Sequence, residues 1–184
     1  MVIPGFVAND RTTLGLQRAL AAAGYRVTGW GLGLNKGATA DMLERLAEKV
    51  AAFGGGGKVI LVGWSLGGVF ARELAKVRPD LVAKVVTMGS PFSGDPRSNN
   101  VWRLYEWIAG HPVDDPPIQT VLAEKPPVPT LALWSSKDGI VSIRSARGLT
   151  GESDRQVEIP CSHMGFGVSG RAYPKIIEAI RDFS

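Results

Sequence analysis

Three side chains of this sequence have the types and the order that nucleophilic catalysis requires, namely Ser65, Asp138 and His163. A serine hydroxyl is a weak nucleophile at neutral pH, so it needs a base within hydrogen-bonding reach and a carboxylate that orients this base. Ser65 is the middle residue of the segment 63–67, GWSLG, with a glycine two positions away on each side. Because a Cβ atom at either glycine would crowd a sharp turn, the pattern predicts a serine at the tip of such a turn.

The residues around Ser65 predict the elements that hold this turn. Residues 59–62, VILV, form a short apolar run that is typical of a strand buried on both faces in a parallel sheet. Residues 69–77 change to a helical period of apolar side chains. The N–H of Leu66 is then at the start of a helix, where unpaired donors and the helix dipole favour a negative charge. Leu66 is therefore expected to supply half of an oxyanion hole.

Asp138 and His163 each follow another predicted strand. Residues 130–134, TLALW, precede the loop that carries Asp138, and a strand at 156–159 precedes the loop that carries His163. In open parallel sheets, active sites lie beyond the carboxyl ends of the strands. We therefore expect the acid, the base and Ser65 to meet at one edge of the sheet.

The remaining elements alternate in the same way. Strands are predicted at 1–3, 25–30 and 83–88, and helices are predicted at 10–23 with Asp10 as its cap, at about 39–53 and at 174–183. Strands that alternate with helices indicate βαβ units. The fold class is therefore α/β, a three-layer sandwich of about six mostly parallel strands with helices on both faces. The 184 residues are predicted to form a single domain, 1–184.

Around Ser65 the sequence resembles the α/β-hydrolase superfamily, on its lipase and esterase side. The segment Gly63-Trp64-Ser65-Leu66-Gly67 matches the nucleophile elbow, and the order serine, acid, histidine is that of the superfamily. The resemblance implies a second oxyanion donor after the first strand, for which Phe6 is the first choice and Val7 the next. It also implies that the usual first two antiparallel strands are missing, which favours a minimal hydrolase core or a trimmed start.

The function implied by this resemblance is hydrolysis of a carboxylic ester through an acyl-enzyme, without a cofactor. Acyl transfer to an alcohol or amine, amide cleavage and polyester hydrolysis would use the same three residues. A non-catalytic binding protein on the same fold is a further alternative. The expected substrate is a small-molecule ester, and the sequence leaves acyl length, stereoselectivity and oligomeric state open.

The long irregular stretch 89–129 contains most of the candidate substrate contacts. An apolar helix is predicted at 101–108, either as a small cap over Ser65 within residues 92–127 or as part of the core or a dimer interface. The stretch also holds the rival acids Asp114 and Asp115, which follow no predicted strand. The residues expected to bind substrate are Trp64, Phe92, Trp102 and Trp107.

Composition excludes several other classes of protein. The single cysteine, Cys161, rules out an intrachain disulfide, and with only two histidines a metal site is not expected. The net charge of +4 comes from scattered lysines and arginines without a basic run, so no nucleic-acid partner is expected. The sequence has no run of 18 apolar residues and no signal-peptide pattern at its start. We therefore expect a cytoplasmic protein without a transmembrane segment, with a secreted form that has lost a leader as the alternative.

Overall fold

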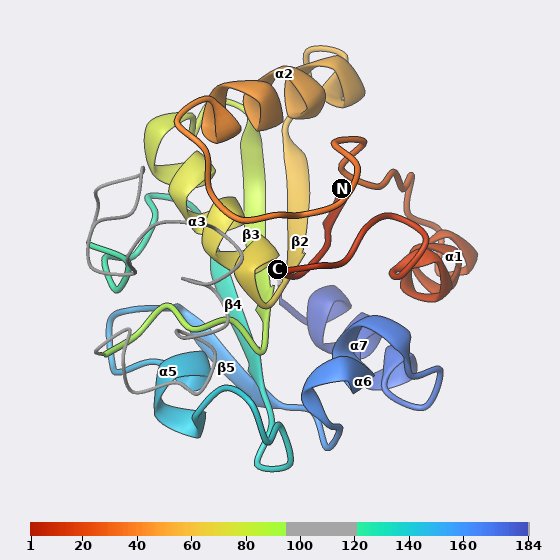
Figure 1. Cartoon of the computed structure of the whole chain (residues 1–184), viewed down its shortest axis with the longest axis vertical. Helices are drawn as coiled ribbons and strands as arrows, with labels where there is room; N and C mark the ends of the chain where they lie inside the picture. Colours follow the sequence, from red (N-terminus) through yellow and green to blue (C-terminus); the bar gives the residue numbers. More distant parts are fainter. Residues whose placement is uncertain (95–120, 184) are drawn as a thin grey trace.

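Parallel strands form one sheet in the computed structural model, which describes residues 1–94 and 121–183. In spatial order they are β1 (Val2–Ile3), β2 (Val59–Trp64), β3 (Val82–Met88), β4 (Thr130–Trp134) and β5 (Arg155–Glu158). Every neighbouring pair is parallel, so the strands all end at the same edge of the sheet (Figure 1). This edge is where the sequence places Ser65, Asp138 and His163.

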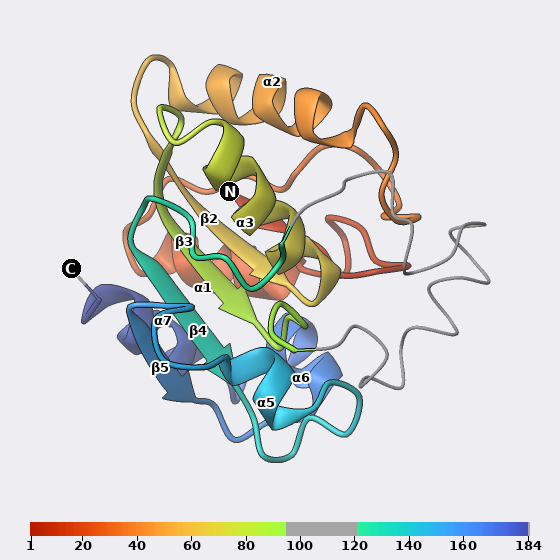
Figure 2. The same ribbon diagram turned by 90° about the vertical axis from the view of Figure 1, so that its left-hand side faces the viewer.

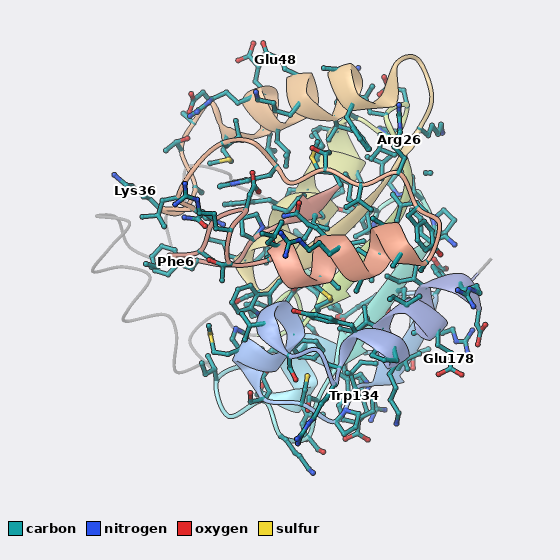
Figure 3. The ribbon with its side chains drawn as sticks, turned by 90° about the vertical axis from the view of Figure 1, so that its right-hand side faces the viewer. Phe6, Arg26, Lys36, Glu48, Trp134 and Glu178 are labelled. Carbon is teal, nitrogen blue, oxygen red and sulfur yellow. The ribbon has the colours of Figure 1, made fainter. Side chains whose placement is uncertain are left out.

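Helices cover both faces of the sheet. One face carries α1 (Leu14–Ala22), α6 (His163–Val168) and α7 (Tyr173–Arg181), which lie in front of the sheet in Figure 3. The other face carries α2 (Met42–Gly54) and α3 (Leu66–Val77), and the short helix α5 (Ile143–Arg147) lies near β4 and β5 (Figure 2). The described residues thus confirm the predicted three-layer α/β sandwich.

Alternation along the strands divides the core into two parts. In β2, Val62 and Trp64 join the apolar cluster under α1, α6 and α7, whereas Val59 and Leu61 join the cluster under α2 and α3. Successive side chains of a strand point to opposite faces, so each face is packed by every second residue. The short apolar run at the start of the elbow is therefore buried on both sides.

The predicted strand at 25–30 is wrong in extent, and the sheet of the described residues has five strands where about six were expected. Only a single bridge, Gly29 to Val2, remains of that strand. The carboxylate of Asp10 accepts hydrogen bonds from the backbone N–H groups of Trp30 and Gly31, both at 3.0 Å. These bonds hold the chain in a loop, and they also explain why Asp10 does not cap α1, which begins only at Leu14.

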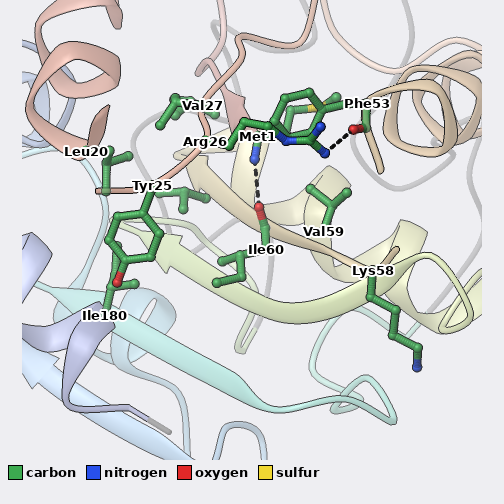
Figure 4. A pocket seen from close by; sticks show the side chains of 12 residues that line it. Met1, Leu20, Tyr25, Arg26, Val27, Phe53, Lys58, Val59, Ile60 and Ile180 are labelled. Carbon is green, nitrogen blue, oxygen red and sulfur yellow. Dashed lines mark hydrogen bonds between the residues drawn. The ribbon is translucent and has the colours of Figure 1, made fainter. Parts of the chain in front are cut away.

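A pocket of about 200 Å³ lies at the amino ends of β1 and β2, far along the strands from their carboxyl edge (Figure 4). Its walls are largely apolar, and the exposed residues Arg26 and Lys58 also line it. The amino group of Met1 donates a hydrogen bond to the carbonyl of Ile60 at 2.7 Å beside it. Because this pocket is at the opposite end of the strands from Ser65, it is not part of the candidate active site.

Within residues 1–94 and 121–183, no helix combines the length and the apolar character that crossing a bilayer requires.

Candidate active site

Ser65 occupies a strained turn between β2 and α3. Its backbone has φ 53° and ψ −123°, and Val7 is the other residue besides glycines with a positive φ among residues 1–94 and 121–183. Such a conformation costs about 1–3 kcal/mol and persists where the surrounding structure enforces it. Here Ser65 donates its backbone N–H to the carbonyl of Met88 at 2.8 Å, which ties the turn to the end of β3. The sharp turn expected from the glycine spacing is confirmed.

The glycines of this turn are required by close backbone contacts. A Cβ atom on Gly63 would lie 2.4 Å from the carbonyl oxygen of Gly67 and from backbone atoms of Gly68. A Cβ atom on Gly67 would lie 2.4 Å from the carbonyl oxygen of Ile3. The turn is therefore packed backbone against backbone, and the start of α3 lies directly against the end of β1.

Asp138 and His163 form a buried pair at the same edge of the sheet. The imidazole Nδ1 lies 2.8 Å from Oδ2 and 3.0 Å from Oδ1 of the carboxylate, and both residues are 5% exposed. A carboxylate only accepts hydrogen bonds, so Nδ1 of His163 is the donor to Asp138, and in the neutral imidazole Nε2 is then the proton acceptor. This is the tautomer that a general base for a serine requires.

The carboxylate of Asp138 is held by the backbone. Its Oδ1 atom accepts from the N–H groups of Ile140 at 2.9 Å and Val141 at 2.6 Å. The backbone N–H of His163 donates to the carbonyl of Asp138 at 3.0 Å. These bonds fix both the position of the carboxylate and the distance between the two loops, so the pair is preorganised.

A buried hydroxyl also joins the acid loop and the base loop. Ser135, at the end of β4, donates through Oγ to the carbonyl of Cys161 at 2.6 Å and accepts from the N–H of Lys137 at 3.0 Å. The sequence analysis did not identify Ser135 as part of the site. In the sequence, Ser135 is recognisable only as a small polar residue directly after a strand. The carbonyl to which its hydroxyl donates, that of Cys161, lies 26 positions away.

Trp64 connects the nucleophile turn to His163. Its indole Nε1–H donates to the backbone carbonyl of His163 at 3.0 Å, and its ring centroid lies 5.9 Å from that of the imidazole. The indole is 2% exposed and packs so closely against Gly167 that a Cβ there would be 2.8 Å from it. The structure thus places Trp64 behind His163, as its support, and a contact of Trp64 with substrate stays a prediction.

Both expected oxyanion donors belong to segments that adjoin Ser65. Leu66 is the first residue of α3. Phe6 belongs to the loop 4–8 that follows β1, and a Cβ atom on the neighbouring Gly5 would be 3.2 Å from the Cβ of Ser65. The loop therefore lies directly beside the serine, as the site would require, although the donor roles of Leu66 and Phe6 stay predictions.

A family model for the alpha/beta hydrolase fold matches residues 2–109, which is more than half of the chain. The chain belongs to the alpha/beta hydrolase fold family.

Solved structures agree on the fold of this alpha/beta hydrolase. Polyneuridine aldehyde esterase superposes with a TM-score of 0.69 at 17% identity over 98% of both chains. A monoacylglycerol lipase from Paleococcus ferrophilus gives 0.66 at 18% identity, over 100% of this chain and 93% of the lipase. A methylesterase from Arabidopsis gives 0.65 at 15% identity over 98% of both chains. At these identities the similarity establishes a shared fold.

Phe92, a predicted substrate contact, has a packing role in this hydrolase. Its ring is 1% exposed and lies under the guanidinium group of Arg72, 4.1 Å from the ring centre. Arg72 is itself buried and donates to the backbone carbonyls of Glu124 and Glu152, both at 3.0 Å. The burial of Phe92 gives no support to a substrate contact.

The other predictions for the irregular stretch lie outside the described residues. They concern Trp102 and Trp107 as substrate contacts, the helix at 101–108 with its cap role, and the rival acids Asp114 and Asp115. In the part of the chain that the structure describes, no three His, Cys, Asp or Glu side chains are grouped as a metal site would need.

Cys161 lies beside the acid but is expected to be unreactive. Burial, together with the negative charge of Asp138, raises the pKa of its thiol to about 11. The thiolate is the reactive form, and a raised pKa keeps the thiol protonated up to a higher pH. At pH 8 we therefore expect iodoacetamide to alkylate Cys161 at least about 100-fold more slowly than a cysteine peptide.

The rate of this alkylation is expected to rise about tenfold per pH unit between pH 8 and 10. The variant Asp138→Asn loses the charge that contributes to the shift, so its Cys161 should react faster at pH 8 than in the wild type. Mass spectrometry follows the adduct, and Cys161→Ser provides the unlabelled control because the sequence has one cysteine. Rapid alkylation of the folded wild type at pH 8 would contradict this prediction.

Proposed function

We propose that this alpha/beta hydrolase is a serine carboxylic ester hydrolase that works through an acyl-enzyme. The observation that carries the proposal is the buried Asp138–His163 pair, with Nδ1 2.8 Å from the carboxylate, at the same edge of the sheet as a serine held at φ 53°. Trp64 supports the placement of the base next to the nucleophile, because its indole binds the His163 carbonyl and its backbone directly precedes Ser65.

The proposed reaction has two steps. The Oγ atom of Ser65 attacks the ester carbonyl while Nε2 of His163 takes the hydroxyl proton and then returns it to the leaving alcohol. Asp138 holds the imidazole in the productive tautomer and stabilises its positive charge. The backbone N–H groups of Leu66 and Phe6 donate to the oxyanion of the tetrahedral intermediate. A water molecule, activated by His163, then releases the acid.

The similarity to proteins named as esterases and lipases supports an ester as the substrate. The reaction requires no cofactor, because the serine, the base and the backbone donors supply all of its steps. Acyl transfer, amide cleavage and polyester hydrolysis remain alternatives on the same residues, but no contact in the described structure favours one of them over ester hydrolysis.

A fluorophosphonate probe tests the proposal on the wild-type protein. The probe phosphonylates an activated serine, so we expect a single adduct on Ser65 in a tryptic digest and loss of activity toward a nitrophenyl ester in parallel. Folded protein that carries no adduct on Ser65 would contradict the proposal that Ser65 is a catalytic nucleophile. Product analysis in the presence of methanol separates hydrolysis from acyl transfer, since a transferase would release the methyl ester in excess over the acid.

A further inference from the structure

One buried side chain, Asn35, holds the loop 4–8 beside Ser65. Asn35 is 0% exposed. It lies in the irregular connection between α1 and α2 and is itself part of no helix or strand. Its backbone N–H donates to the carbonyl of Ala8, and its own carbonyl accepts from the N–H of Val7, both at 2.8 Å. Its side-chain Nδ2 donates to the carbonyl of Pro4 at 2.9 Å. Three bonds from one residue thus span the whole loop.

The other polar atom of the Asn35 side chain, Oδ1, forms a hydrogen bond within the segment that carries Asn35. Oδ1 of Asn35 accepts from the backbone N–H of Gly37 at 3.1 Å. The amide nitrogen of Asn35 therefore donates to Pro4, and the amide oxygen accepts from Gly37. An aspartate would lack the donor, and a serine would be too short for both contacts. Phe6 and Lys36 lie on the same side of the molecule, where the two loops meet (Figure 3).

The loop needs such a support because its backbone is strained. Val7 has φ 57°, a conformation that is unusual for any residue with a side chain and a marked outlier for a β-branched one. Val7 is 50% exposed, so burial contributes little to hold it. Val7 and Ser65 are the two such residues besides glycine in the described chain, and each is the direct neighbour of an expected oxyanion donor, Phe6 and Leu66. Strain of this kind gathers at functional sites.

The Pro4 carbonyl is held from the other side as well. A Cβ atom on Gly67 would be 2.6 Å from this oxygen, so the start of α3 lies against it. The carbonyl is thus confined between the amide of Asn35 and the helix that begins at the nucleophile. Fixing Pro4 relative to α3 fixes the position of the next two residues, Gly5 and Phe6, relative to Ser65.

We propose that Asn35 is a positioning residue that aims the backbone N–H of Phe6 at the oxyanion. This inference rests on the proposed function, because an oxyanion forms only if Ser65 attacks an acyl carbonyl. The role needs no contact of Asn35 with substrate. Asn35 acts by keeping the donor in place before the reaction, which is where oxyanion stabilisation gains its effect.

The test compares Asn35→Ala and Asn35→Asp with the wild type, using a nitrophenyl ester and the fluorophosphonate. Loss of one oxyanion donor typically lowers kcat by about 10²–10³-fold. We expect kcat of Asn35→Ala to fall by about 10²-fold with KM within about threefold, and the rate of phosphonylation of Ser65 to fall in parallel. Asn9→Ala is the matched control, because the Asn9 side chain also binds backbone N–H groups, of Arg11 and Thr12, without reaching the loop 4–8. It should keep the wild-type kcat.

Asn35→Asp has the same shape and serves as the second variant if Asn35→Ala does not fold. An ionised carboxylate faces the Pro4 carbonyl with no hydrogen to donate, whereas a protonated one restores a donor. The ratio of its kcat to that of the wild type should therefore rise as the pH falls from 8 to 5.5. A residue that only fills the core would leave this ratio constant, since the rates are measured per folded active site.

Three outcomes decide the inference. A fall in kcat for Asn35→Ala with a pH-dependent ratio for Asn35→Asp supports it. If the wild type is active and kcat is unchanged in both Asn35 variants, the role of Asn35 is overturned and the proposed function stays intact. This holds even if the melting temperature of the variants falls. A wild type whose Ser65 neither reacts with the probe nor turns over esters overturns the proposed function and this inference with it.

Discussion

Replacing Ser65 with alanine is expected to lower kcat for a nitrophenyl ester by about 10⁶-fold, because the bond-forming atom is removed. Replacing His163 with alanine should have a similar effect, since the hydroxyl then has no base. Asp138→Asn should cost less, about 10⁴-fold, because the serine and the imidazole remain but the imidazole loses the partner that selects its tautomer. Steady-state kinetics measure this order for the three variants, and the rate of fluorophosphonate labelling of Ser65 compares His163→Ala with Asp138→Asn.

The double variant of Ser65 and His163 makes the prediction sharper. Residues that act as one unit are strongly non-additive, so Ser65→Ala combined with His163→Ala should be no slower than either single variant. Ser169→Ala is the control for a serine-to-alanine change, as Ser169 lies at the end of α6 and its backbone N–H donates to Gly165. Residual activity of Ser65→Ala within tenfold of the wild type would show that another group is the nucleophile.

Replacing Gly67 with alanine is expected to destabilise the whole protein. The new Cβ would lie 2.4 Å from the carbonyl oxygen of Ile3 and 2.6 Å from that of Pro4. Both neighbours are backbone atoms, which cannot move without separating β1 from the start of α3. Overpacking of a core costs about 1–3 kcal/mol when side chains can adjust, and here we expect at least about 3 kcal/mol. For a chain of this size, that free energy lowers the melting temperature by about 6–12 °C.

Gly170→Ala is the matched control for Gly67→Ala. Gly170 has no neighbouring atom within 4 Å of an added Cβ and is not among the glycines with a positive φ. Alanine there should leave the melting temperature unchanged or raise it slightly, because it lowers the entropy of the unfolded chain. Thermal unfolding followed by circular dichroism compares the two. A melting temperature of Gly67→Ala within about 2 °C of the wild type would mean that the loop 4–8 yields easily, and the confinement of the Pro4 carbonyl would then be wrong.

The sequence by itself predicted the layered α/β class and the position of the three catalytic candidates after their strands. These predictions depend on short-range signals. The apolar run before Ser65 reports a doubly buried strand, and the glycines around it report a turn with no room for a Cβ. Because parallel strands end at one edge, the order of elements then brought Asp138 and His163 to a common place, where the structure shows them paired.

The extent of the strand at 25–30 was decided by tertiary contacts. Its alternation of apolar and polar residues is local, but the carboxylate of Asp10 binds the N–H groups of Trp30 and Gly31 from 20 and 21 positions away. Because its carboxylate is engaged in these bonds, Asp10 does not cap α1. A side chain that can serve either of two backbone segments gives the same sequence signal for both.

The supports of the site were likewise decided only by the tertiary structure. Trp64 reads as a substrate contact in the sequence, yet its indole binds a carbonyl 99 positions away, and Asn35 reaches Pro4 across 31 positions. Local patterns report whether a residue is buried and in which element it lies. Which polar atom meets which backbone group depends on how the loops at the sheet edge pack against one another, and that packing exists only when the chain is folded.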